Sequence, residues 1–133
     1  MSVVVDSSVW CHVWGKGTPP DDPQVRKLLG LVKQGPETIA LLGVILQEVL
    51  QGLRDERQFA RAREQLEEFP LIALDRQDYV AAANLRHRCQ TRGVQAGTVD
   101  LQIAAACLQH DCALLTCDAD FSRIAACCPL QLL

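Results

Sequence analysis

The stretch "SVVVDSSVWCHVW", residues 2–14, opens an alternation of strands and helices that continues along the chain. Residues 2–5 form a short β-branched run, which favours a strand because branched side chains pack well on a pleated surface. Asp6 follows directly, and residues 7–14 are expected to form a helix that Asp6 or Ser7 can cap. The first element is therefore a strand that ends at an acid and leads into a helix.

Further elements alternate in the same way. Helices are expected over residues 23–35, 44–53, 55–69, 75–93, 98–111 and 118–128, and strands within 37–43 and over 71–74, 112–116 and 130–133. Strands separated by helices require crossover connections, which are typical of a mostly parallel sheet. The predicted fold class is α/β, with a central parallel sheet that helices flank on both faces.

Composition is typical of one globular domain over residues 1–133, with 49% hydrophobic and 22% charged residues. No apolar run approaches the roughly 18 residues of a membrane span. The apolar opening is interrupted by Asp6 and has no basic segment before it, which is unlike a signal peptide. We therefore expect a cytoplasmic protein without a membrane partner.

The chain has seven cysteines, an odd count, and lacks a CxxC motif. Most lie among Ala, Leu and Ile, where a free cysteine behaves as a small buried hydrophobe. The even spacing of Cys107, Cys112 and Cys117 raises the alternative of a zinc site, but structural zinc ligands usually come in closely spaced pairs. We expect packing, with neither zinc nor a disulfide.

Acidic residues recur at places that a parallel sheet would bring together. Asp6 follows the first strand, and Asp118 follows the strand at 112–116, with Asp120 two residues on. Ligands bind at the carboxyl ends of parallel strands, so these acids are expected on one rim. Glu48 and Asp100 lie in helices that can approach the same rim.

Each acid alone has a simpler explanation. Asp6 can cap a helix, Asp100 can favour a helix N-terminus, Asp118 can belong to a turn, and Glu48 can be a solvated edge residue. Together, however, gathered carboxylates repel one another and require a cation. Carboxylate oxygens suit Mg²⁺ or Mn²⁺, and two such metals about 4 Å apart can assist phosphodiester hydrolysis. Adding two divalent cations, +4, to the net charge of −3 gives +1, which makes a nucleic-acid substrate acceptable.

Four segments, "VVVDSSVW", "LQEVLQG", "RGVQAGTVDLQIAAAC" and "LLTCDADF", follow one another across nearly the whole chain. They resemble the four acidic motifs of PIN-domain nucleases, and specifically of VapC-type toxins. The resemblance implies that Asp6, Glu48, Asp100 and Asp118 are the catalytic, metal-binding acids. It also implies that the hydroxyls of Ser7 and Thr116 line the site. Asp118 is preferred as the fourth acid because it is nearer the strand end, and Asp120 is the alternative. Where relatives often carry a further polar residue, this chain has Thr98 and Val99 before Asp100.

The resemblance further implies Mg²⁺- or Mn²⁺-dependent cleavage of RNA, often structured RNA such as tRNA or rRNA. It implies a homodimer, and inhibition by a small cognate antitoxin protein. Two other functions remain open. One is a metal-independent ribonuclease that uses histidines as general acid and base, and the other is a non-catalytic PIN-like module that binds RNA or protein.

Two secondary features have competing interpretations. Two arginine clusters can hold RNA phosphates or can be ordinary solvated helix faces. The first cluster, and the one assigned to RNA, is Arg86, Arg88 and Arg92, and the second is Arg54, Arg57 and Arg61. Trp10 and Trp14 share a helix face and can either belong to the core or a dimer contact, or line a groove for an amphipathic partner helix.

Overall fold

The structure is a computed structural model and describes residues 1–15 and 21–133. In chain order, the elements of these ranges are β1 (Val3–Val5), α1 (Ser7–Trp10), α2 (Pro23–Gln34), the 3-10 helix η1 (Pro36–Thr38), β2 (Ile39–Leu42), α3 (Gly43–Gln51), α4 (Glu56–Leu66), β3 (Leu71–Ile72), α5 (Arg76–Thr91), α6 (Thr98–Gln109), β4 (Ala113–Leu115) and α7 (Asp120–Ala125).

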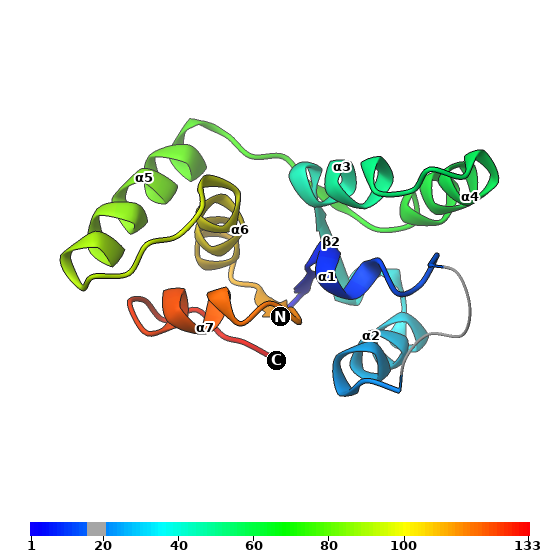
Figure 1. Cartoon of the computed structure of the whole chain (residues 1–133), viewed down its shortest axis with the longest axis horizontal. Helices are drawn as coiled ribbons and strands as arrows, with labels where there is room; N and C mark the ends of the chain where they lie inside the picture. Colours follow the sequence, from blue (N-terminus) through cyan, green and yellow to red (C-terminus); the bar gives the residue numbers. More distant parts are fainter. Residues whose placement is uncertain (16–20) are drawn as a thin grey trace.

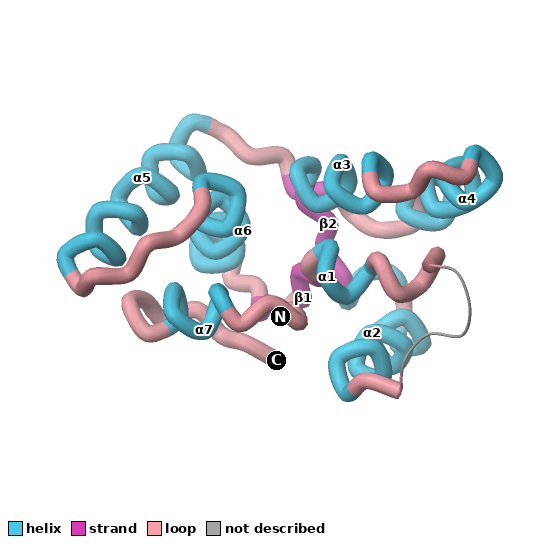
Figure 2. Tube along the Cα trace, in the orientation of Figure 1, coloured by secondary structure: helices cyan, strands magenta, loops and turns pink. Residues whose placement is uncertain are grey.

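The four strands form one parallel sheet in the order β3-β2-β1-β4. In Figure 1, α5, α6 and α7 lie on one side of the central strands, and α1, α2, α3 and α4 lie on the other. Figure 2 shows the strands between these two groups of helices. The predicted α/β class and the parallel sheet flanked by helices are confirmed.

The register of the sheet brings two strand ends together. Val5 of β1 pairs with Leu115 of β4, and β1, β2 and β4 are buried along their whole length. Such continuous apolar strands are expected where helices cover both faces of a sheet. The residues that follow β1 and β4 therefore leave the sheet side by side, as the sequence predicted.

Several expected elements are longer than the observed ones: the strand expected over 71–74 covers only Leu71–Ile72, and the helix expected over 118–128 covers only Asp120–Ala125. The strand expected over 130–133 is only one parallel bridge between Leu132 and Leu114. The segment does run beside β4, where Leu114 donates to the carbonyl of Gln131 at 2.8 Å and accepts from the N–H of Leu133 at 2.9 Å, but the pairing does not extend beyond Leu114. The helix expected over 7–14 ends at Trp10. It then continues as turns because Val13 donates its N–H to Trp10, three residues back.

The two tryptophans belong to the core. Trp10 and Trp14 are 2% and 6% exposed, and their rings stack with centroids 5.7 Å apart. Phe69 packs against Trp10, and the indole Nε1 of Trp14 donates to Oε1 of Gln65 at 2.6 Å. A groove for a partner helix needs these side chains on the surface, so that interpretation is wrong and the core interpretation is confirmed.

All seven cysteines are free thiols. Cys107 and Cys112 are buried in the core, as the packing interpretation requires. Cys117 is exposed just after β4, so packing does not explain it. In the ranges that the structure describes, none of the helices combines the length and the apolar character that crossing a membrane requires.

Candidate functional site

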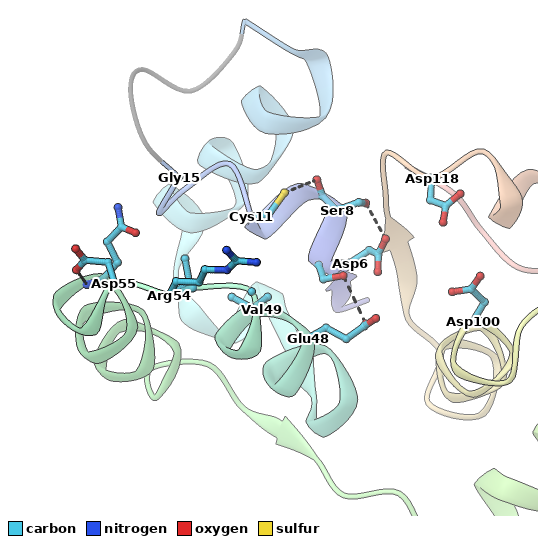
Figure 3. Close-up of a pocket in the computed structure, with 14 residues that line it drawn as sticks. Asp6, Ser8, Cys11, Gly15, Glu48, Val49, Arg54, Asp55, Asp100 and Asp118 are labelled. Carbon is cyan, nitrogen blue, oxygen red and sulfur yellow. Dashed lines mark hydrogen bonds between the residues drawn. The ribbon is translucent and has the colours of Figure 1, made fainter.

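A pocket of about 620 Å³ opens beside the carboxyl ends of β1 and β4. Asp6, Glu48, Asp100 and Asp118 all line it, from four separate segments of the chain (Figure 3). The backbone N–H of Asp6 donates to the carbonyl of Leu115 at 2.9 Å, which continues the pairing of the two strands into the pocket. The rim predicted from the strand ends is therefore present.

Asp6 is the fixed acid of this pocket. Its side chain is 5% exposed, and its Oδ2 accepts hydrogen bonds from the hydroxyls of Ser8 at 2.7 Å and Thr116 at 2.9 Å. The same two hydroxyls accept from the backbone N–H groups of Cys117 and Asp118, both at 3.0 Å. A buried carboxylate needs such partners, and here they also fix its orientation.

Ser8 is a site residue that sequence reasoning missed, because the sequence "DSS" offers two serines and the family resemblance indicated Ser7. The structure shows different partners for the two. Ser7 lines the pocket and donates to Oε1 of Glu48 at a long 3.5 Å, whereas Ser8 makes the shorter bond to Asp6. Thr116 reaches the site through Asp6, as described above.

Glu48 is half-buried on α3 and points into the pocket from the wall opposite Asp118 (Figure 3). Burial raises the pKa of its carboxyl, the negative charge of Asp6 raises it further, and the hydrogen bond from Ser7 opposes the change. Its placement does not support the alternative of a solvated edge residue. Glu48 and Asp6 therefore form one side of the acidic surface.

Three further acids form the other side. Asp100, Asp118 and Asp120 each offer a carboxylate oxygen, and these oxygens lie within 4.8 Å of one another. Burial raises the pKa of Asp100 to about 6, and the charges of Asp118, Asp6, Asp120 and Glu48 add to the effect. The charged forms of these acids thus oppose one another, which is the situation that a bound cation relieves.

The choice between Asp118 and Asp120 stays open, since both lie beside Asp100. Asp118 lines the pocket and is half-buried, and its Oδ1 accepts the backbone N–H of Asp120 at 2.9 Å. Asp120 is exposed and forms an ion pair with Arg123 on α7. This ion pair neutralises part of its charge, which favours Asp118 as the stronger ligand.

The arginines assigned to RNA do not line this pocket. Arg92 donates from Nη1 to the carbonyl of Ala126 at 3.0 Å, and Arg86 lines a separate hollow with Gln90 and Gln95. The pocket is instead lined by Arg54, from the loop between α3 and α4. The sequence placed Arg54 only in the second cluster, because the approach of this loop to α1 depends on tertiary packing.

The sequence profile of the PIN domain family matches residues 3–126, from β1 through α7. This chain belongs to the PIN-domain family. The matched range contains every acid of the pocket, so the acidic site lies within the PIN domain itself. No curated protein matches the chain significantly in sequence.

Solved structures share the PIN fold over nearly the whole length of both chains. A chain of the VapBC2 complex from Rickettsia felis, bound to a promoter DNA fragment, is 20% identical with a TM-score of 0.78, and the match covers 100% of this chain and 98% of that one. A chain of DNA-bound VapBC from Salmonella typhimurium is 16% identical with a TM-score of 0.77, and the match covers 100% of this chain and 97% of that one. VapC20 from Mycobacterium tuberculosis, a sarcin–ricin-loop-cleaving toxin, is 18% identical with a TM-score of 0.67, and the match covers 91% of this chain and 93% of that one. At these identities the likeness shows the fold.

Proposed function

We propose that residues 1–133 form a single divalent-metal-dependent endoribonuclease domain, the toxin component of a type II toxin–antitoxin system. The observation that carries the proposal is the convergence of Asp6, Glu48, Asp100 and Asp118 on one pocket. Membership of the PIN-domain family supports nuclease chemistry. The structural likeness to a toxin that cleaves the sarcin–ricin loop supports a structured RNA, such as tRNA or rRNA, as the substrate.

The donor set fits a hard cation. Every charged ligand at the site is a carboxylate, which suits Mg²⁺ or Mn²⁺ rather than a soft metal. Asp6, Glu48, Asp100 and Asp118 would hold the ion or ions, and Asp120 would assist. When bound, a divalent cation supplies an activated water and stabilises negative charge on the phosphodiester.

The residues of the chain have distinct tasks in this proposal. Ser8 and Thr116 hold the Asp6 carboxylate in one orientation through bonds of 2.7 and 2.9 Å. Glu48 stands outside the close group of three aspartates, and burial and Asp6 raise its pKa. Its carboxyl faces the pocket from α3 beside Asp6, so Glu48 would complete the acidic donor set from that side.

The nature of the cleaved ends tests the proposal. The chain is incubated with total RNA in Mg²⁺ or Mn²⁺ and again in EDTA, and the product ends are mapped. Hydrolysis by activated water leaves a 5′-phosphate and a 3′-hydroxyl, and EDTA abolishes it. A cyclic phosphate would indicate attack by the RNA 2′-hydroxyl and the histidine mechanism, and binding without cleavage would indicate a non-catalytic module. Full activity of Asp6→Asn and Asp100→Asn variants would also overturn the proposal.

The location of the histidines speaks against the second mechanism. No histidine is among the described residues that line the acidic pocket. His110 lies near the C-terminus of α6, where its Nε2 is 3.0 Å from Oδ1 of the buried Asp78. That pair joins α6 to the capping box at the start of α5, so it has a structural explanation.

A cognate antitoxin and a second copy of the chain are the expected partners, and the cytoplasm is the expected compartment. One structural neighbour is a toxin–antitoxin complex from Klebsiella pneumoniae and others are VapBC structures, which supports the antitoxin. An acidic pocket can be closed by an arginine, whose planar fork holds carboxylates bidentately. Co-expression with the protein encoded upstream is expected to restore growth, and light scattering of the purified toxin is expected to give twice the chain mass.

A further inference from the structure

Arg54 is the only basic residue among the described residues that line the acidic pocket. It lies in the loop between Gln51, where α3 ends, and Glu56, where α4 begins, and it is exposed. In Figure 3 its side chain extends from this loop toward Asp6 and Glu48, and Asp100 and Asp118 lie beyond those two acids. The guanidinium therefore lies toward the end of the pocket opposite Asp100 and Asp118.

The charge of Arg54 is not neutralised within the described part of the chain. None of the ion pairs found there includes Arg54, although acids are abundant in the same pocket. Five carboxylates line it: Asp6, Glu48, Asp55, Asp100 and Asp118. The nearest in sequence, Asp55, is engaged elsewhere, since its Oδ1 caps α4 by accepting the backbone N–H groups of Arg57 at 2.9 Å and Gln58 at 3.0 Å.

A pocket lined by five carboxylates repels a polyanion even after a cation has entered, so an RNA strand needs a second positive contact there. An unpaired guanidinium supplies it, because its fork of N–H donors matches two phosphate oxygens. An antitoxin residue that closes the acidic end must be a cation, which Arg54 would repel. The position and charge of Arg54 thus favour RNA as its ligand.

We propose that Arg54 binds a backbone phosphate of the RNA next to the scissile one and so positions the strand across the acids. The inference rests on the proposed ribonuclease function and adds to it a substrate contact in the loop between α3 and α4. Arg54 is a substrate-binding residue in this scheme, and the chemical step is left to the acids. Loss of Arg54 should therefore raise KM much more than it lowers kcat.

The test compares Arg54→Gln and Arg54→Lys with a matched control, Arg76→Gln, which removes an exposed arginine of α5 that does not line the pocket and belongs to neither arginine cluster. The probe is a labelled RNA oligonucleotide that spans the cleavage site mapped in total RNA. Steady-state cleavage in Mn²⁺ is measured at several salt concentrations. Arg54→Gln is expected to raise KM about tenfold or more, the size expected for one charge-assisted hydrogen bond to phosphate. The slope of log KM against log salt concentration should decrease by about one, because one phosphate contact is lost.

Arg54→Lys keeps the charge but loses the bidentate geometry, so its KM should be intermediate, and Arg76→Gln should match the wild type. The inference is overturned if KM of Arg54→Gln stays within twofold of the control, or if only kcat falls. It is also overturned if Arg54→Gln weakens the complex with the co-expressed antitoxin and leaves KM unchanged. Absence of cleavage by the wild-type chain is a different result, which overturns the proposed function itself.

Discussion

Replacing Asp100 by Asn should make the metal-free protein more stable. The pKa of Asp100 is raised from its ordinary value of 3.8 to about 6 by burial and by the charges of Asp118 and Asp6, with smaller contributions from Asp120 and Glu48. This difference corresponds to about 3 kcal/mol of penalty on the charged form. The side chain is partly exposed, so solvent screens the charges, and about 1 kcal/mol in the free energy of unfolding is the expected gain. For a chain of this length that is about 3 °C in Tm.

The pH dependence follows from the sign of the pKa change. Because the folded-state pKa of Asp100 lies above the unfolded one, the proton on Asp100 stabilises the folded chain. That stability is complete below about pH 4 and is lost as pH rises through about 6. Asn does not ionise, so the variant keeps it. The two proteins should melt alike near pH 4, and the variant should melt higher at pH 7.5.

Thermal melts in EDTA between pH 4 and pH 8 provide the measurement. Asp111→Asn is the control, because Asp111 is exposed outside the pocket and Asn tolerates its positive φ of 53°. Mg²⁺ or Mn²⁺ should then raise the Tm of the wild type more than that of Asp100→Asn, which has lost a ligand. A metal-free Asp100→Asn variant that melts at or below the wild type at pH 7.5 would refute the reasoning.

Three other substitutions give distinct outcomes. Ser8→Ala removes one of two hydroxyl bonds to Asp6, so metal affinity and cleavage should fall several-fold while Tm changes little, as a metal titration would show. Trp14→Ala should reduce the unfolding free energy of the isolated chain by about 3 kcal/mol or more, measured by urea denaturation, because the buried indole leaves a cavity. His110→Ala should destabilise by about 1–3 kcal/mol at pH 7. Burial opposes ionisation of Asp78, but the hydrogen bonds of its capping box and from His110 outweigh burial and lower the pKa of Asp78. The stability that the His110–Asp78 pair provides should therefore be lost as acid protonates Asp78, and acid denaturation curves would show this loss.

The sequence was informative wherever short-range pattern and sheet topology agree. The apolar runs before Asp6 and Asp118 predicted two buried strands, and a parallel sheet requires their carboxyl ends to lie on one edge. The pairing of Val5 with Leu115 confirms that expectation. The pattern was less informative at element ends, because α1 stops through turn hydrogen bonds that its apolar spacing does not reveal.

The details of the site depend on packing that a linear pattern does not contain. Ser7 and Ser8 are adjacent, and the rotation of about 100° per residue along α1 determines which hydroxyl faces Asp6. Arg54 and Arg86 are both exposed, but Arg54 lines the acidic pocket from a loop, whereas Arg86, on α5, lines a separate hollow. Choosing between such candidates requires the tertiary placement of α3 and α4 relative to α1.

The pocket combines one rigid acid with several that oppose each other. Asp6 is held by two hydroxyl groups and is almost fully buried, so its position is set before any cation arrives. Asp100 and Glu48 instead have raised pKa values, which means that their charged forms destabilise the metal-free fold. A bound divalent cation removes that repulsion, so part of its binding free energy appears as folding stability. Substitutions that stabilise the metal-free chain at these two positions should therefore be the ones that weaken metal binding and cleavage.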